Sequence, residues 1–236
     1  MLFYYIRHGD PIYDPDSLTP LGKRQAEAVG RRLARFDFDT VYTSSSTRAM
    51  ETAKPLCELI KKEPVVLDWA NESHAGKETG ATREDGRWCW IFAEPRARKL
   101  FASEEMRAMG FDWMNHPALA DKKQTLENGF ARVERETTAL FSSLGYDRLP
   151  DGSFRCTSPN DKRVALFAHG GFGMMFLSTL LHIPYPAFST RFDLVHTGLC
   201  VIRFADEDGI AYPCMLMHGS TGHLYAEHLA DLALLG

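Results

Sequence analysis

The 236-residue sequence contains few cysteines and no unbroken hydrophobic segment of membrane-spanning length. No two cysteines form a CxxC pair; the five are Cys57, Cys89, Cys156, Cys200 and Cys214. A disulfide scaffold requires a short, cysteine-rich secreted chain, so we expect free thiols in a reducing cytosol. The N-terminus, MLFYYIRHG, has only six apolar residues before Arg7 and no basic segment ahead of them. This pattern predicts no signal peptide and a cytoplasmic location.

The stretch Val164–Thr190 is the one segment to weigh as a membrane span, because it contains no Asp, Glu, Lys or Arg. His169-Gly170-Gly171, Pro184 and Pro186 interrupt it, so no run of about 20 apolar residues remains. A buried strand followed by a buried helix explains the stretch better, and we expect no membrane partner.

The sequence also lacks a large excess of positive or negative charge. The sequence has 27 Lys and Arg against 31 Asp and Glu, a formal net charge of −4, and no run of cations. This balance disfavours nonspecific binding to nucleic acid or to anionic membranes. A small anionic substrate remains compatible, because a local cluster of two or three cations does not show in a net charge. The 44% hydrophobic content is that of an ordinary soluble globular protein.

Strand and helix patterns alternate over most of the chain. Short apolar runs predict strands at Leu2–Ile6, Thr40–Thr43, Val65–Leu67, Val164–Ala168, Leu199–Phe204 and Tyr212–His218. Helices are predicted from Pro20 with Thr19 as N-cap, after the Ser44–Thr47 cluster, over Leu126–Leu144 and after Gly170-Gly171. The alternation predicts the α/β fold class, as a three-layer α/β/α sandwich with a largely parallel central sheet.

The segment Lys77–Gln124 interrupts this alternation. It has no clear strand and holds three of the four tryptophans, Trp88, Trp90 and Trp113. We expect residues 77–124 to form a helical cap insertion over the sheet edge, within a single α/β domain of residues 1–236. A second independent domain of under 50 residues is less favoured, because so short a chain buries too little core. We expect the aromatic residues mainly to pack within the insertion.

Polar and charged residues follow four of the predicted strands at their carboxyl ends. In chain order they are Arg7-His8-Gly9, Arg48, Glu72 and His169-Gly170. In open α/β sheets, ligands bind beyond this edge. The sequence therefore predicts that two arginines, two histidines and one carboxylate meet at a single binding site.

These residue types suit a phosphoryl group. Arginine forks bind phosphate oxygens and stay charged at any working pH. A neutral imidazole can attack phosphorus and hold the phosphoryl group covalently, while a second imidazole donates to the non-bridging oxygens. A carboxylic acid can protonate the departing alkoxide and then, as carboxylate, activate water. Helix N-termini after Gly9, near Arg48 and at Gly170 add backbone donors, and neither a metal nor a cofactor is required.

Five stretches occur in a family-specific order: Leu2–Gly9; Leu18-Thr19-Pro20-Leu21-Gly22 with Gln25-Ala26; Ser44–Ala53; Asn71-Glu72-x-His74-x-Gly76; and Phe167-Ala168-His169-Gly170. Together they resemble the histidine phosphatase (phosphoglycerate mutase-like) superfamily, branch 1. The resemblance covers residues 1–76 and 163–224 and leaves the insertion outside. Thr221-Gly222-His223-Leu224 resembles a weaker signature of the same branch, to which we assign no catalytic role.

The resemblance implies a role for each residue at the sheet edge. It implies that His8 is the phosphorylated nucleophile and that Arg7, Arg48 and His169 complete the phosphate pocket. Glu72 matches the proton donor of this branch. The predicted catalytic residues are thus His8, Glu72 and His169, and the predicted phosphate-binding residues are Arg7, Arg48, Gly9 and Gly170, with no metal ligand.

Each of these residues also has a structural alternative. Arg48 could be a solvated arginine on a helix, Glu72 a surface carboxylate and His169 a core histidine, but their common position at strand ends favours a site. Three histidines lack the carboxylates or cysteine pairs of a metal site and are interpreted as structural or surface residues: His218, His223 and His228. His74 and His196 stay open as pocket residues.

The segment after the first motif favours hydrolysis over transfer. Asp10–Ser17 contains three Asp and no Lys or Arg, so it would repel the second phosphate that a mutase must hold. It also departs from the longer, more basic segment of glycolytic mutases, and Asp14 stands where many relatives have Asn. We expect a metal-independent phosphomonoesterase that hydrolyses a small phosphorylated metabolite through a phosphohistidine. The alternatives are a phosphoglycerate-mutase-like phosphotransferase and a non-catalytic phospholigand-binding module.

The insertion gives two opposed signals about the substrate. Its aromatic residues favour a partly apolar leaving group. Its cations favour further anionic groups; they are Arg83, Arg87, Arg96, Arg98 and Lys99. The sequence names neither the phosphate ester nor the oligomeric state.

Overall fold

A mixed six-stranded sheet forms the centre of the fold, in the computed structural model, which describes residues 1–229. The strand order is β13-β11-β1-β10-β4-β5, with the bounds Cys214–Ser220, Leu199–Arg203, Leu2–Arg7, Arg163–Ala168, Thr40–Ser44 and Val65–Leu67. Strands β1, β10, β4 and β5 pair in parallel, whereas β11 and β13 extend the sheet antiparallel beyond β1. The largely parallel sheet predicted from the sequence is confirmed.

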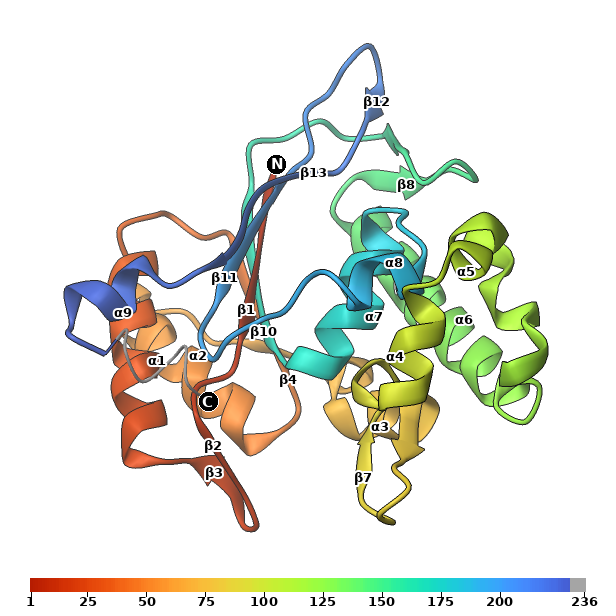
Figure 1. The fold of residues 1–236 in the computed structure, drawn as a ribbon. Helices are drawn as coiled ribbons and strands as arrows, with labels where there is room; N and C mark the ends of the chain where they lie inside the picture. The colour runs from red at the N-terminus through yellow and green to blue at the C-terminus, as the bar shows by residue number, and fades with distance from the viewer. Residues whose placement is uncertain (230–236) are drawn as a thin grey trace.

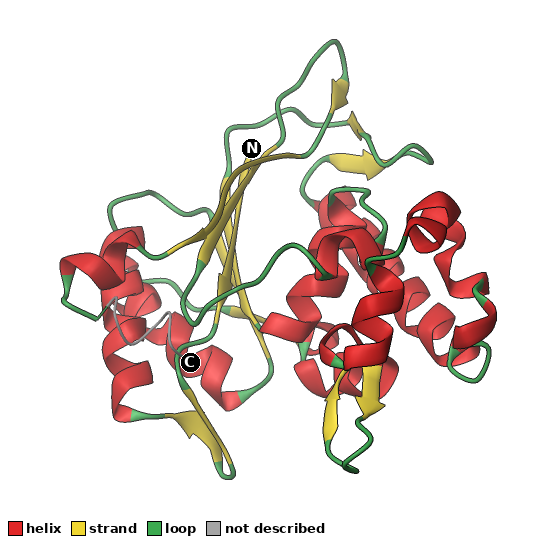
Figure 2. Cartoon of the chain, viewed as in Figure 1, coloured by secondary structure: helices red, strands yellow, loops and turns green. Residues whose placement is uncertain are grey.

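Helices cover both faces of this sheet (Figures 1 and 2). One layer contains α1 (Pro20–Leu33), α2 (Thr47–Ile60) and α9 (Gly222–Ala226), and the other contains α3 (Glu72–Thr79), α6 (Lys123–Ser143), α7 (Gly170–Leu180) and α8 (Tyr185–Ser189). Side chains of β1 alternate between the layers, as the pleat of a strand requires. Tyr4 and Ile6 join the core of α1 and α2, and Phe3 and Tyr5 join the core of α6 and α7. The predicted three-layer sandwich is confirmed.

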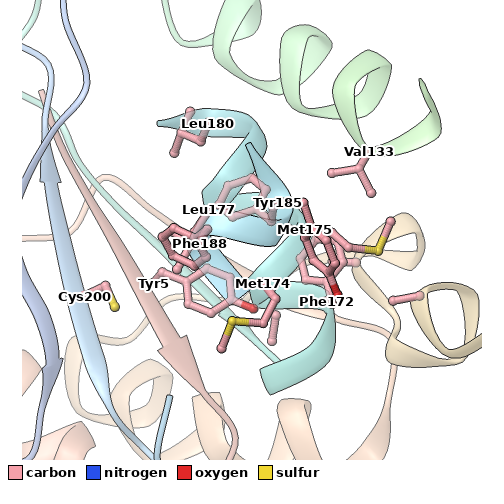
Figure 3. Close-up of a cluster of buried hydrophobic side chains, with 14 of the residues drawn as sticks. Tyr5, Val133, Phe172, Met174, Met175, Leu177, Leu180, Tyr185, Phe188 and Cys200 are labelled. Carbon is pink, nitrogen blue, oxygen red and sulfur yellow. The ribbon is translucent and has the colours of Figure 1, made fainter. Parts of the chain in front are cut away.

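The larger core surrounds α7. Figure 3 shows Tyr5 of β1 beside Met174 and Leu177 of α7, with Val133 of α6 on the opposite side. Nearly all residues of α7 are buried, and its sequence has no charged residue and lacks the usual polar face. The uncharged stretch Val164–Thr190 is thus a buried strand and a buried helix, as predicted. Among the described helices, none combines the length and hydrophobicity of a membrane span.

The insertion contains a hairpin as well as helices. Strands β6 (Gly80–Thr82) and β7 (Trp88–Trp90) pair antiparallel, so the prediction of no strand in residues 77–124 was wrong. The sequence does not mark these strands, because each has three residues and buries only its middle one, Ala81 or Cys89. The remaining elements are α4 (Pro95–Phe101), α5 (Glu104–Met109) and 3-10 turns at Ile91–Ala93, Gly110–Asn115 and Pro117–Leu119.

The insertion extends the outer helical layer. Phe101, Met106 and Trp113 are buried in the core that α6 and α8 share, and Figure 1 shows α5 beyond α8, away from the sheet. The assignment of residues 1–236 to one domain with an insertion at 77–124 stays a prediction, and residues 230–236 lie outside the described part.

Short elements complete the fold. They are the hairpin β2 (Pro11–Tyr13) and β3 (Asp16–Leu18), the small sheet β12 (Ile210–Ala211), β9 (Phe154–Cys156) and β8 (Tyr146–Arg148), and a 3-10 turn at Asp68–Ala70. The region Tyr146–Lys162 is therefore the β8–β9 hairpin followed by a loop.

The loop that follows β1 crosses the start of α1 with its backbone in direct contact. A Cβ atom on Gly9 would lie 2.6 Å from the carbonyl oxygen of Gly22, and one on Gly22 would lie 2.1 Å from that of Asp10. Thr19 caps α1 as predicted, since its Oγ1 accepts from the Gly22 amide at 3.0 Å. The two glycines and the cap fix the path of the chain on either side of this crossing.

We expect Gly22→Ala to lower the free energy of unfolding by about 1–3 kcal/mol, because its Cβ would press on backbone that cannot rotate away. Denaturant titration measures the change. Gly222→Ala is the matched control at another helix start, since the nearest atom to its Cβ is the end of the Arg32 side chain at 3.6 Å. Equal stability of the two variants would contradict the close crossing.

Candidate active site

Two neighbouring parallel strands carry the two histidines of the site. In the pairing of β1 with β10, Arg7 lies opposite Ala168, and the amide of His8 donates to the carbonyl of Ala168 at 2.9 Å. His8 and His169 therefore leave the sheet side by side, and their ring centroids are 5.1 Å apart. The structure thus brings these two sequence-predicted residues together at one edge of the sheet.

The His8 ring is held in one tautomer. Its Nδ1 lies 2.7 Å from the carbonyl oxygen of Gly9, which can only accept, so Nδ1 carries the proton and donates. Nε2 then bears the lone pair, and it is buried without a partner among the described residues. Burial, with the nearby His169 and Arg7, holds the pKa of His8 well below its ordinary value. The imidazole is thus neutral near pH 7, with its nucleophilic nitrogen unengaged.

His169 is fixed from both ends. Its Nε2 lies 2.8 Å from Oγ of Ser44 and 3.3 Å from Oγ of Ser46. The Tyr5 hydroxyl donates to the His169 carbonyl at 2.6 Å and accepts from its amide at 3.2 Å. Burial, followed by the charges of Arg48 and Arg7, lowers the pKa of His169 well below its usual range. Nδ1 is left 3.6 Å from Oε2 of Glu72.

Glu72 and Arg48 form one hydrogen-bonded unit with Asp16. Oε1 of Glu72 accepts from the Gly171 amide at the start of α7 (2.8 Å), and Oε2 accepts from Arg48 (3.1 Å). The second terminal nitrogen of Arg48 donates to Oδ1 of Asp16 at 2.7 Å. The other oxygen of Asp16 accepts from the Thr47 amide at 2.7 Å, near the start of α2. Arg48 is therefore clamped between two carboxylates.

Sequence reasoning missed this role of Asp16. It treated Asp16 only as one of three acids that repel a second phosphate. The pairing depends on the β2–β3 hairpin, which brings Asp16 back to the start of α2, and no periodic pattern marks so short a hairpin.

Arg7 lies against the start of α7 and contacts a third histidine. A Cβ on Gly170 would be 3.2 Å from Cζ of Arg7, so glycine allows this approach. Arg7 donates to the carbonyl of Leu194 and, at 3.0 Å, to Nε2 of His196. Burial and the charge of Arg7 lower the pKa of His196 to about 4.

The two histidines that the sequence left open differ in position. The His196 ring centroid lies 5.6 Å from that of His8, which places His196 in the site. His74 is not in the cluster; its Nε2 lies 3.2 Å from Asp68 and its side chain is 36% exposed. His223, of the weaker C-terminal signature, is buried behind the site, with Nε2 3.0 Å from Oγ1 of Thr197.

The predicted glycines differ in what they offer a phosphate. The amide of Gly9 already donates to Oγ1 of Thr52 at 3.0 Å, so that donor is used within the protein. Gly170 is the first residue of α7. The N-terminus of this helix faces the site, because the Gly171 amide donates a hydrogen bond to Glu72.

Several buried polar atoms of the site have no partner among residues 1–229: Nε of Arg7, Nε2 of His8, Nε of Arg48 and Nδ1 of His169. Burying a polar atom without a hydrogen bond costs about 1–3 kcal/mol, so such atoms rarely gather by chance. The two arginine nitrogens are donors on fixed cations. The arrangement fits a buried anion that would satisfy them.

The same residues offer a set of potential metal ligands. One donor atom each from His8, Glu72 and His169 lies within 4.8 Å of the other two, and two histidines with one glutamate hold zinc in some enzymes. Here Arg48 donates directly to Glu72, and the charge of Arg7 depresses the pKa of both histidines. Fixed positive charge at this range repels a metal cation and attracts an anion, so the set fits a phosphate better.

A cavity of about 420 Å³ opens beside Arg48 and Glu72. Its lining residues come from the β2–β3 hairpin, the starts of α2 and α3, and strand β7; they are Tyr13, Asp16, Ser46, Arg48, Asn71, Glu72, Ser73, Gly76, Trp88 and Trp90. The insertion thus contributes the two tryptophans of β7 to the approach to the site.

Comparison with known proteins gives a consistent family. Residues 3–105 match the family model of the histidine phosphatase superfamily (branch 1). A 2,3-bisphosphoglycerate-dependent phosphoglycerate mutase 2 from Gloeobacter violaceus is 26% identical over 156 residues, which cover 61% of this chain and 70% of the relative. A PE-PGRS family protein, PE_PGRS11 of Mycobacterium tuberculosis, is 34% identical over 83 residues, 30% of this chain but only 14% of that much longer protein.

Solved structures of other proteins share this fold. The crystal structure of phosphoserine phosphatase from Entamoeba histolytica, in complex with 3-phosphoglyceric acid, superposes with a TM-score of 0.59 at 19% identity, covering 94% of this chain and 98% of that one. This likeness shows a shared fold. Together with the match of residues 3–105 to the family model and the similarity to the mutase, it makes the histidine phosphatase superfamily (branch 1) the family that this chain resembles.

Proposed function

We propose that the protein is a metal-independent phosphomonoesterase that hydrolyses a small phosphorylated metabolite through a phosphohistidine on His8, with Glu72 as proton donor. The observation that carries this proposal is the group of unpaired buried atoms on Arg7, His8, Arg48 and His169. Three of them suit the oxygens of a phosphoryl group, and the fourth, Nε2 of His8, holds the lone pair that would attack phosphorus.

In the first step, Nε2 of His8 attacks phosphorus, and the P–N bond forms as the P–O ester bond breaks. Glu72, as the carboxylic acid, gives its proton to the departing ester oxygen, which leaves as an alcohol. Arg7, Arg48 and His169 bind the non-bridging oxygens as they gather charge.

In the second step, water attacks the phosphohistidine. Glu72, now a carboxylate, takes a proton from the water, the P–N bond breaks and inorganic phosphate leaves. Nδ1 of His8 keeps its proton in both steps and donates it in the hydrogen bond to the Gly9 carbonyl. Nε2 is therefore the reacting atom in both steps.

Hydrolysis is favoured over transfer by the charge at the cavity mouth. Arg48 is the cation among the cavity's described lining residues, and Asp16 and Glu72 already pair with it. A mutase must retain a second phosphate, and a net negative lining opposes this. The curated relative is named a mutase, so phosphotransfer is the second candidate, and a phospholigand-binding module without turnover is the third.

We also propose a location and a domain organisation. Five unpaired cysteines support a cytoplasmic location. We propose a single α/β domain in which residues 77–124 cap the approach to the site.

We expect His8→Ala to abolish phosphate release from a generic aryl phosphate in excess chelator, and Glu72→Gln to lower kcat by about 10²- to 10⁴-fold, the usual contribution of a positioned acid. His74→Ala is the matched control, because His74 shares α3 with Glu72 but lies outside the cluster. Equal release by the wild type and His8→Ala would defeat the assignment. Movement of phosphate to an added alcohol would favour a transferase, and binding without turnover would favour the third candidate.

We expect the His8 imidazole to be neutral at pH 6, with its proton on Nδ1. An unperturbed histidine of pKa 6.5 would be about three-quarters protonated there. Because the folded-state pKa of His8 lies well below 6.5, its proton is lost at lower pH and the nucleophile stays available. Nitrogen NMR of the ring measures the state, with His8→Ala to assign the signal. An imidazolium at pH 6 would contradict the burial argument.

A further inference from the structure

Aromatic side chains stand on two sides of the cavity mouth. Tyr13 belongs to the β2–β3 hairpin, and Trp88 and Trp90 belong to β7 of the insertion. Figure 1 shows both hairpins extending beyond the same end of the sheet. Tyr13 is 67% exposed and Trp88 57% exposed, so two large rings face solvent at one opening. A concentration of exposed apolar surface beside a polar site indicates a binding surface.

The tryptophan wall is fixed against the catalytic residues. A Cβ on Gly171 would lie 2.3 Å from the Trp90 ring, so Trp90 packs directly on the residue whose amide holds Glu72. Trp90 stacks with Phe92 at 6.1 Å and meets Trp88 edge to face at 5.0 Å. On the β2–β3 hairpin, the Tyr13 ring lies against Arg48, whose Cζ is 5.4 Å from the ring centre.

The insertion's cations do not reach this cavity. Arg83 and Arg96 line a separate cavity of about 530 Å³, and Arg96 pairs with Glu84. Within the described residues, the charged lining near the aromatic wall is Asp16, Arg48 and Glu72, and it carries no cation free of a carboxylate. The structure thereby separates the two signals that the sequence left opposed.

We propose, on the basis of the function proposed above, that this cavity binds the leaving group and selects phosphomonoesters of uncharged, flat aromatic alcohols. The phosphoryl group lies at His8, and the aromatic ring of the alcohol stacks between Tyr13 and the Trp88–Trp90 wall. Esters with a second anionic group are disfavoured, because the described lining offers them no cation free of a carboxylate.

Two primary alkyl esters test this proposal: benzyl phosphate and phosphoglycolate. We expect a higher kcat/KM for benzyl phosphate in the wild type. Trp88→Ala should lower that value about three- to tenfold, the usual contribution of an aromatic contact, and leave kcat/KM for phosphoglycolate within twofold. Tyr13 is left intact because its ring contacts Arg48. Trp90 is left intact because of its contact with Gly171.

Tyr212→Ala is the control, because Tyr212 is 59% exposed and does not line the cavity. A preference for phosphoglycolate, or equal losses on both esters, would overturn the subsite while leaving His8-dependent hydrolysis standing. If neither ester turns over, calorimetry of benzyl phosphate binding decides instead. Weaker binding to Trp88→Ala supports the subsite, and unchanged binding overturns it.

Discussion

The parallel pairing of β1 with β10 is the constraint on which the site depends. Arg7 lies opposite Ala168, so His8 and His169 leave the sheet together. This register is set by the packing of β1, which is buried on both faces. A slip of one residue would exchange the layers of Phe3 and Tyr4, and both cores would lose their partners. Hydrophobic packing therefore determines the distance between His8 and His169.

At this edge of the sheet, burial sets the protonation state of the histidines and the arginines supply fixed positive charge. Low polarity keeps His8 and His169 neutral, while Arg7 and Arg48 retain their charge because guanidinium does not deprotonate. Asp16 and Glu72 hold Arg48 in place within the protein itself. A phosphate entering the site would compete with these carboxylates for the hydrogen bonds of Arg48 and so weaken its pairing with them. A chain with a net charge of −4 can thus bind an anion, and the neighbouring acids favour its release.

The sequence predicted what continuous patterns encode. The buried strands, the N-cap Thr19 and the motifs that end β1 and β10 are local features, so the sheet edge with His8, Arg48, Glu72 and His169 could be placed in advance. Asp16 and His196 could not, because each reaches the site through tertiary structure: a short hairpin for one, and the chain before an antiparallel strand for the other. The β6–β7 hairpin could not be predicted, because its strands are too short to show an alternating pattern of apolar residues. The position of Trp90 depends on its contact with Gly171, about 80 residues further along the chain.

The proposed mechanism requires covalent transfer of the phosphoryl group to one nitrogen, and rapid-quench mass spectrometry tests this step most directly. The protein is mixed with excess aryl phosphate, quenched at alkaline pH within milliseconds to preserve phosphoramidates, and digested. The account predicts a phosphorylated peptide that contains His8, formed at least as fast as phosphate is released and bearing the phosphoryl group on Nε2. Phosphate release without a labelled peptide, or label on His169 or His196, would contradict it.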